Sequence, residues 1–220
     1  MPTQQLVANS PLTSTLRLLQ FASPAEGHHF PGQYITLQLE SQKPGYFALV
    51  NQPHQPIRLL IKQEGALGSA IASLQEGQEV ELSNAMGAGF SLEKSAGKDL
   101  VILCNGSGIS ACHPVIQHEL QQGLSRSVHL YYGIRSALDR CFTEDINRWQ
   151  DAGVKVETVI SQPDPSWTGA RGYVQDLARA QGYLRHDIAL LLVGTPTMQK
   201  QAKEMWSDAG LPPDLILTNF

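Results

Sequence analysis

The stretch that decides the fold runs from Leu100 to Pro114 and reads LVILCNGSGISACHP. It opens with a short apolar run rich in β-branched side chains, which is typical of a strand buried on both faces. A Gly-x-Gly turn follows at Gly106–Gly108, and helical spacing begins at Ile109. A strand that turns through glycines into a helix directs backbone N–H groups and the positive end of the helix dipole at one point. This geometry suits the pyrophosphate of a nucleotide.

The turn alone is a weak indication, because Gly-x-Gly turns also end strands that bind nothing. The third glycine of the usual dinucleotide fingerprint is absent. Ala111 stands in its place, and Pro114 follows in the first turns of the helix. The interpretation therefore depends on the rest of the chain.

The composition excludes several classes of protein. The chain has 220 residues, enough for two compact domains, and its formal net charge of −4 is scattered without a basic stripe. Nucleic-acid binding is therefore disfavoured, and no apolar run approaches the length of a membrane span. The polar N-terminus lacks the features of a signal peptide, and the three cysteines fit a reducing compartment, so we expect a cytoplasmic protein. The spacing of cysteines and histidines indicates no metal site.

The chain divides into two parts that differ in the pattern of their apolar and turn residues. Short, often alternating segments punctuated by Gly and Pro predict a small antiparallel barrel, with strands at 12–21, 33–40, 46–51, 57–63 and 78–83 and a helix at 67–74. Apolar strands at 100–104, 128–133, 154–161, 188–194 and 215–218 then alternate with helices at 109–122, 142–152, 173–181 and 196–209. That alternation predicts a parallel sheet wrapped by helices, with ligands at the carboxyl ends of its strands. We expect a barrel domain over residues 1–96 and an α/β nucleotide-binding domain over 97–220.

Seven short motifs occur in a consistent order along this chain. They are PGQYI at 31–35, GALGS at 65–69, GAGF at 87–90, GSGI at 106–109, YGIR at 132–135, SQP at 161–163 with GYV at 172–174, and GTPTM at 194–198. In this order, and with a barrel before an α/β domain, they resemble the ferredoxin–NADP⁺ reductase-like flavoprotein oxidoreductases. Within that family the chain is most similar to the "fruit protein" type of FAD/NAD(P)-binding oxidoreductase from plants and bacteria.

The resemblance implies FAD, or FMN in its place, on the barrel and a nicotinamide dinucleotide on the α/β domain. The residues that it implies for cofactor binding are Tyr34, Phe47, Ala48, Val50, Asn51, Gly68, Ser69, Gly106, Ser107, Gly108, Ile109, Arg135, Ser136, Arg140, Gly194, Thr195 and Met198. Phe47 is the expected flavin-stacking residue. The terminal Phe220 either covers the flavin ring or is a frayed end. No other catalytic residue is assigned.

The flavin motif of the family, Arg-x-Tyr-Ser, is altered here. Gly45 stands where the resemblance implies a phosphate-binding arginine, and Ala48 replaces the serine that bonds flavin N5. Loss of a charge-assisted phosphate contact, ~1.5–3 kcal/mol, weakens binding on the order of tenfold to a hundredfold. Arg58 on the next strand either substitutes for the missing cation or is an exposed strand residue.

The end of the second parallel strand bears on the choice of nucleotide. Arg135, Ser136 and Arg140 could hold a 2′-phosphate, because arginine offers bidentate donors to phosphate. This favours NADPH over NADH. The alternative for Arg140 is an ion pair with Glu144, four residues on along a helix.

The leading hypothesis is an NAD(P)H-dependent flavin oxidoreductase that passes hydride from nicotinamide to FAD, or to a loosely held flavin, at the domain junction. The final electron acceptor and the oligomeric state are not encoded in any recognisable pattern. The alternative is a degenerate, non-catalytic member of the family that acts as an interaction or regulatory module. A hydrolase is disfavoured, because Asn105 and Cys112 stand where an elbow around Ser107 or Ser110 requires glycine.

Overall fold

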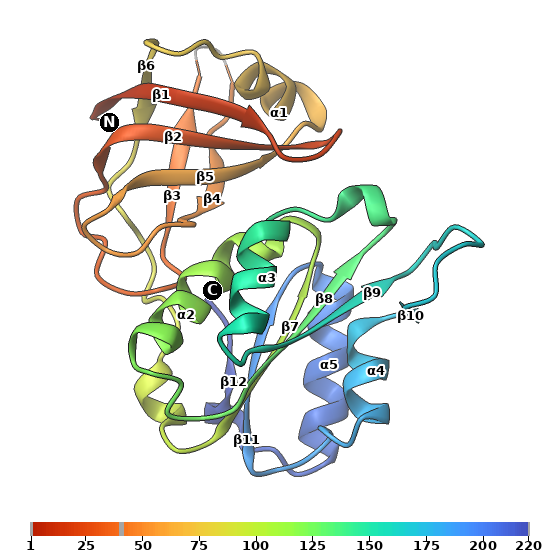
Figure 1. Cartoon of the computed structure of the whole chain (residues 1–220). Helices are drawn as coiled ribbons and strands as arrows, with labels where there is room; N and C mark the ends of the chain where they lie inside the picture. The colour runs from red at the N-terminus through yellow and green to blue at the C-terminus, as the bar shows by residue number, and fades with distance from the viewer. Residues whose placement is uncertain (1, 40–41, 220) are drawn as a thin grey trace.

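Two domains follow one another along the chain in the computed structural model, which describes residues 2–39 and 42–219 (Figure 1). The first domain contains β1 (Thr3–Pro11), β2 (Leu16–Pro24), β3 (Tyr34–Gln38), β4 (Gly45–Ala48), β5 (Pro56–Lys62), α1 (Gly65–Ala72) and β6 (Glu79–Leu82). The second contains β7 (Asp99–Asn105), α2 (Ile109–Gln121), β8 (Val128–Ile134), α3 (Thr143–Asp151), β9 (Lys155–Ile160), β10 (Ala170–Arg171), α4 (Val174–Ala180), β11 (Ile188–Val193), α5 (Pro196–Asp208) and β12 (Ile216–Leu217).

The first domain is the expected antiparallel barrel. Its strands lie in the order β4-β3-β6-β1-β2-β5, and each pairs antiparallel with its neighbours. The edge strands meet through a bridge between Leu49 and Leu59, and the Val50 N–H donates to the Arg58 carbonyl at 3.0 Å. Closing the sheet in this way removes the exposed backbone groups of two edges.

The sequence pattern does not predict β1, and β2 begins at Leu16 rather than at the predicted residue 12. β1 is largely polar and only Leu6 is fully buried in it, so alternation is invisible in the sequence. It is a strand because β2 and β6 pair with it from both sides. Residues 12–15 form the β1–β2 turn rather than a strand, with the Leu12 N–H donating to the Leu16 carbonyl at 2.9 Å.

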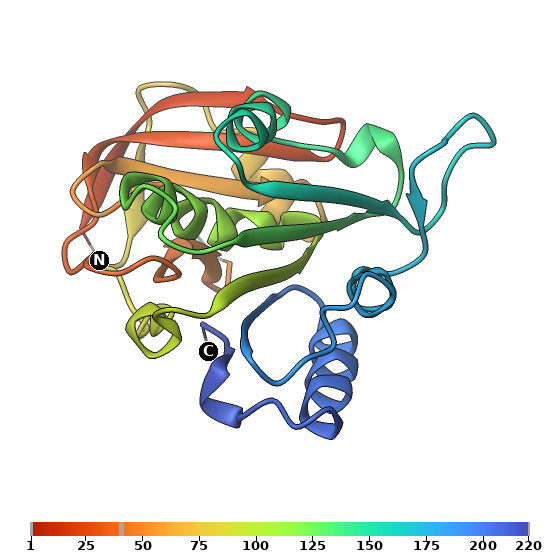
Figure 2. The same ribbon diagram turned by 60° about the horizontal axis from the view of Figure 1, so that its bottom comes forward.

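The second domain is the expected parallel sheet. Its strands lie in the order β10-β9-β8-β7-β11-β12, and every neighbouring pair is parallel. The apolar run at its centre alternates between two cores: Leu100 and Ile102 face α2 and α3, whereas Val101 and Leu103 face α4 and α5. Figure 2 shows these helix pairs on opposite sides of the sheet. The chain reverses its direction of winding between β7 and β11, where ligands bind in such sheets.

An apolar interface joins the two domains. One buried cluster contains barrel residues Leu16, Val50 and Leu60 together with Phe90, Ile109, Cys112 and Val115. Two hydrogen bonds cross the same boundary: Gln52 Nε2 donates to the Pro114 carbonyl at 2.5 Å, and Asn219 Nδ2 donates to the Gly32 carbonyl at 3.2 Å. Separating the domains would expose this apolar surface, so the barrel is held in a fixed position over α2.

Two buried histidines make the stability of the fold depend on pH. His129 on β8 stacks on Tyr131 with ring centroids 4.4 Å apart and contacts the edge of Tyr183. Burial, with a smaller contribution from Lys155, lowers the pKa of His129 to about 4. Burial also lowers the pKa of His28 in the barrel to about 4, helped by the neighbouring histidines. Both side chains are therefore neutral in the folded protein at neutral pH.

We expect the free energy of unfolding to decrease as pH falls from 6.5 towards 4, because the unfolded histidines bind protons that the folded ones do not. The stability that the neutral, buried histidines contribute is fully present above pH 6.5. Urea unfolding at a series of pH values measures it, and His129→Phe should reduce the slope of stability against pH. An unchanged slope in that variant would contradict the assignment.

Candidate functional site

The turn between β7 and α2 has the backbone geometry of an anion-binding site. Gly106 has a φ of +54°, which is a conformation that favours glycine, and α2 begins three residues later at Ile109. A Cβ atom on Gly108 would lie 3.0 Å from the Val193 carbonyl oxygen, so any other residue there would push β11 slightly away from the turn. No acidic residue occupies the first turn of α2. The positive end of the helix dipole is thus left for a ligand.

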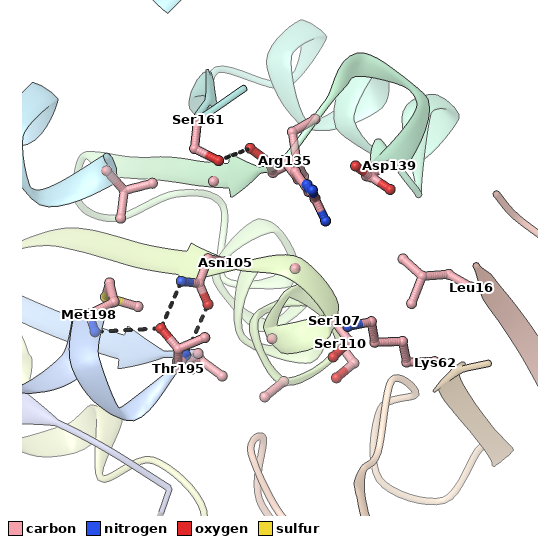
Figure 3. A pocket seen from close by; sticks show the side chains of 18 of the residues that line it. Leu16, Lys62, Asn105, Ser107, Ser110, Arg135, Asp139, Ser161, Thr195 and Met198 are labelled. Atoms are coloured by element: carbon pink, nitrogen blue, oxygen red, sulfur yellow. Dashed lines mark hydrogen bonds between the residues drawn. The ribbon is translucent and has the colours of Figure 1, made fainter. Parts of the chain in front are cut away.

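A side-chain bridge spans the point where β7 and β11 diverge. Asn105 Oδ1 accepts a hydrogen bond from the Thr195 N–H at 3.0 Å, and Asn105 Nδ2 donates to Thr195 Oγ1 at 3.2 Å. Thr195 Oγ1 in turn caps α5 by accepting from the Met198 N–H. Gly194 lies directly beneath the bridge, where an added Cβ would be 2.1 Å from Asn105 Oδ1. Figure 3 shows this network at one side of a pocket.

That pocket is a cavity of about 810 Å³ along the carboxyl ends of β7, β8 and β11, continuing to the barrel (Figure 3). Its volume lies in the range of sites for small molecules and cofactors. The α/β domain contributes Asn105, Gly106, Ser107, Gly108, Ser110, Arg135, Asp139, Ser161, Tyr173, Val193, Gly194, Thr195 and Met198 among its walls. The barrel contributes Thr15, Leu16, Ala48, Lys62, Gln63 and Glu64. The residues around the turn thus fit a dinucleotide lying across the switch point.

The far end of the cavity, beyond β8, carries one cation and one anion. Arg135 is exposed, and its Nε donates to Gln162 Oε1 at 2.7 Å. Asp139 Oδ2 accepts hydrogen bonds from both the N–H and the hydroxyl of Ser136, each at 2.9 Å. These bonds cap the short helical turn Ala137–Asp139. The Ser136 hydroxyl is therefore already used as a donor, and a carboxylate lies beside Arg135 in the cavity wall.

Arg140, expected in the same subsite, lies outside the cavity lining. Its Nε is buried without a hydrogen-bond partner, and in the part of the chain that the structure describes no ion pair joins it to Glu144. Tyr173 belongs to the GYV motif at 172–174, for which the sequence indicated no role. It lines the cavity and is 63% exposed. Its ring offers a flat apolar face of the kind on which a nucleobase stacks.

The barrel end of the cavity carries a second pair of charges. Lys62, the last residue of β5, forms an ion pair with Glu64 and points towards Ser107 and Ser110 (Figure 3). The hydrogen bond from Lys62 lowers the pKa of the Glu64 carboxyl, so this carboxyl is charged at neutral pH. Within residues 2–39 and 42–219, Lys62 and Arg135 are the only cations in the cavity wall.

The structure separates the predicted site residues into two groups. Ala48, Gly106, Ser107, Gly108, Arg135, Gly194, Thr195 and Met198 line the cavity, whereas Tyr34, Phe47, Val50, Asn51, Gly68, Ser69, Ile109, Ser136 and Arg140 do not. Val50 and Ile109 pack in the interdomain core, and Asn51 Oδ1 accepts from the Arg58 N–H at 2.8 Å within the barrel. Phe220 lies outside the described residues.

Sequence reasoning did not find Lys62, Glu64 or Asp139. Lys62 and Glu64 lie more than forty residues before the turn that they face, and only the packing of the domains brings them there. Asp139 had a local indication, since Ser-x-x-Asp is a capping pattern, but that pattern says nothing about a cavity.

Comparisons with known proteins agree with this architecture. Residues 102–204 match the family described as the oxidoreductase NAD-binding domain. The fruit protein pKIWI502 of Actinidia deliciosa is 28% identical over 210 residues, covering 85% of this chain and 65% of the relative. The phenol 2-monooxygenase reductase component DmpP of a Pseudomonas species is 31% identical over 163 residues, covering 68% of this chain and 45% of the relative. The chain thus spans about two thirds or less of the length of these relatives.

A solved structure of a ferredoxin NADP⁺ reductase from Neisseria gonorrhoeae, with bound FAD and NADP, superimposes with a TM-score of 0.85. It is 17% identical and covers 100% of this chain and 98% of its own. The chain therefore has the two-domain fold of the ferredoxin–NADP⁺ reductase-like flavoproteins. Residues 102–204 of its second domain are similar to the oxidoreductase NAD-binding domain family. In the described residues no helix is both long enough and apolar enough to cross a bilayer.

Gly194→Ala should lower the free energy of unfolding by about 1–3 kcal/mol, because Gly194 has a φ of +148° and its new Cβ would meet Asn105 Oδ1. Adding Asn105→Ala removes the clashing oxygen and should recover part of the loss. Urea unfolding of the single and double variants measures this coupling.

Gly172→Ala is the matched control, because Gly172 also has a positive φ, +104°, but a Cβ there would meet no atom within 4 Å. Asn105→Ala should not rescue this control. Equal rescue of both alanine variants would show that Asn105 does not determine the requirement for glycine at position 194.

Proposed function

We propose that this protein is an NAD(P)H-dependent oxidoreductase whose reductant binds across the carboxyl ends of β7 and β11 and whose flavin ring meets it at the domain junction. The observation that carries the proposal is the cavity of about 810 Å³ that runs from Arg135, past the glycine turn, to the barrel. When bound, the nicotinamide supplies a hydride and the isoalloxazine ring accepts it. The protein contributes binding and orientation.

The phosphates of the reductant are assigned to the turn at Gly106–Gly108. Backbone N–H groups and the start of α2 favour an anion there, and the Ser107 and Ser110 hydroxyls face the same space (Figure 3). Lys62 reaches this space from the barrel and supplies the nearest cation. A dinucleotide bound in this way contacts both domains.

The nicotinamide end is assigned to the Asn105–Thr195 bridge. The bridge, Gly194 and Met198 form the cavity wall where the strands diverge, and Ala48 and Asn219 also line the cavity. These side chains are neutral, so this part of the cavity excludes charge and suits an aromatic ring. Hydride transfer needs two rings in contact and no acid–base residue, which agrees with the absence of a carboxylate pair in this wall.

The identity of the nucleotide depends on the subsite beyond β8. Arg135 favours the 2′-phosphate of NADPH, but Asp139 presents a carboxylate to the same space and engages Ser136. Of the three residues that the sequence offered for a 2′-phosphate, only Arg135 lines the cavity.

Anaerobic addition of NADH or NADPH to the purified protein with flavin tests the proposed function. Loss of flavin absorbance near 450 nm, faster with the protein than without it, is expected. If either nucleotide binds but no flavin is reduced, the oxidoreductase proposal fails, and the non-catalytic interaction module becomes the better explanation.

Lys62→Gln should weaken NAD(P)H binding about tenfold, because one charge-assisted phosphate contact contributes ~1.5–3 kcal/mol in full and less at this exposed position. Titration of nucleotide fluorescence measures the dissociation constant. Lys200→Gln, an exposed lysine on α5 that lies away from the cavity lining, is the matched control and should leave binding unchanged. Equal affinities of wild type and Lys62→Gln would remove Lys62 from the site.

Asp139→Asn should raise the affinity for NADPH relative to NADH by about threefold to tenfold, because it removes a negative charge facing the proposed 2′-phosphate position. The measurement is the ratio of the two dissociation constants. Arg135→Ala should move the ratio in the opposite direction. A ratio that neither variant changes would place the 2′ position elsewhere.

A further inference from the structure

The space beside Gly45 on β4 is closed by packed side chains. A Cβ atom on Gly45 would lie 2.7 Å from Leu67 Cδ2 and 2.7 Å from Phe47 Cε2. Leu67 belongs to α1, and both side chains pack against the barrel core. Real Cβ contacts are not this short, so a longer side chain at position 45 would require Leu67 and Phe47 to move aside. The position at which the resemblance implies a phosphate-binding arginine is thus filled by two apolar groups.

The start of α1 offers no substitute for that arginine. Glu64 occupies the N-cap position without a side-chain capping bond, and the hydrogen bond from Lys62 lowers the pKa of its carboxyl, so a negative charge lies beside the positive end of the helix dipole. This charge opposes a phosphate at the same place. Lys62, the only barrel cation in the described cavity wall, is paired with Glu64 and points towards Ser107. Arg58, the other candidate cation, is half-buried on β5 and lies outside the cavity lining. In the described cavity wall the barrel therefore offers the phosphates of FMN or FAD no unpaired cation.

The domain junction remains open to a ring. Ala48 of the barrel and Val193 and Gly194 of the α/β domain all line the cavity, and these groups are small and uncharged. A flat isoalloxazine ring fits such walls, whereas the barrel cation that a phosphorylated tail would meet in the described cavity wall, Lys62, is already paired with Glu64. The cavity thus suits the isoalloxazine ring of a flavin better than it suits the phosphates of the flavin tail.

From these contacts, and resting on the proposed function, we propose that the protein takes flavin as a dissociable substrate that it recognises by the isoalloxazine ring alone. Riboflavin, FMN and FAD then bind with similar affinity, and each leaves after reduction. The reaction balances because NAD(P)H gives a hydride and solvent gives a proton. The flavin gains two electrons and two hydrogens, and NAD(P)⁺ is released.

Equilibrium binding of riboflavin, FMN and FAD, measured by quenching of flavin fluorescence, tests the proposal without reference to activity. The three dissociation constants should agree within about threefold, and dialysis should remove each flavin. FAD binding about tenfold or more tighter than riboflavin would overturn the proposal, as would FAD retained through dialysis. Tight FAD that NAD(P)H reduces would leave the proposed function intact, whereas no reduction of any flavin would refute that function itself.

Glu64→Gln tests whether the carboxylate at the start of α1 opposes the phosphates of a flavin. Removing the charge at the start of α1 should strengthen FMN and FAD binding about twofold to fivefold and leave riboflavin unchanged. Glu76→Gln, which removes an exposed barrel carboxylate outside the cavity lining, is the matched control and should change none of the three constants. An equal gain for riboflavin, or no gain for FMN, would contradict the role given to Glu64.

Discussion

The site depends on how closely the backbones of β7 and β11 approach where they diverge. Gly194 lies beneath the amide of Asn105 at a distance that leaves no room for a Cβ atom, and a Cβ on Gly108 would make a tight contact with the Val193 carbonyl. The Asn105 amide then bonds both the backbone and the hydroxyl of Thr195, which fixes the start of α5 relative to the turn before α2. Two helix N-termini and a glycine turn are thereby held around one cavity.

The apolar interface between the domains determines what the other side of that cavity contains. Leu16, Val50 and Leu60 pack into one cluster with residues around α2, so the barrel cannot rotate without exposing apolar surface. This packing places the end of β5, with Lys62 and Glu64, over the nucleotide turn. The charges of the barrel and the dipole of α2 therefore act on the same part of the cavity.

Most of the fold could be predicted because its patterns are local. The run from Leu100 to Cys104 is continuously apolar since both faces of β7 are covered, and the helices that follow show their own spacing. β1 could not be predicted, because a single fully buried leucine leaves no alternation to detect. The same holds for the candidate site. The residues of the glycine turn could be predicted from their local motif, whereas Lys62, Glu64 and Asp139 could not.

The sequence by itself determined the two-domain architecture, the position of the glycine turn and the absence at Gly45 of the arginine that the resemblance implies. Each of these depends on residues that are adjacent along the chain. Only the tertiary structure decided that Phe47 and Leu67 fill the space beside Gly45, that Asp139 rather than Arg140 faces the cavity, and that Lys62 lies opposite Ser107. These facts join segments distant in sequence, and their positions follow from the packing of strands and helices rather than from any local preference.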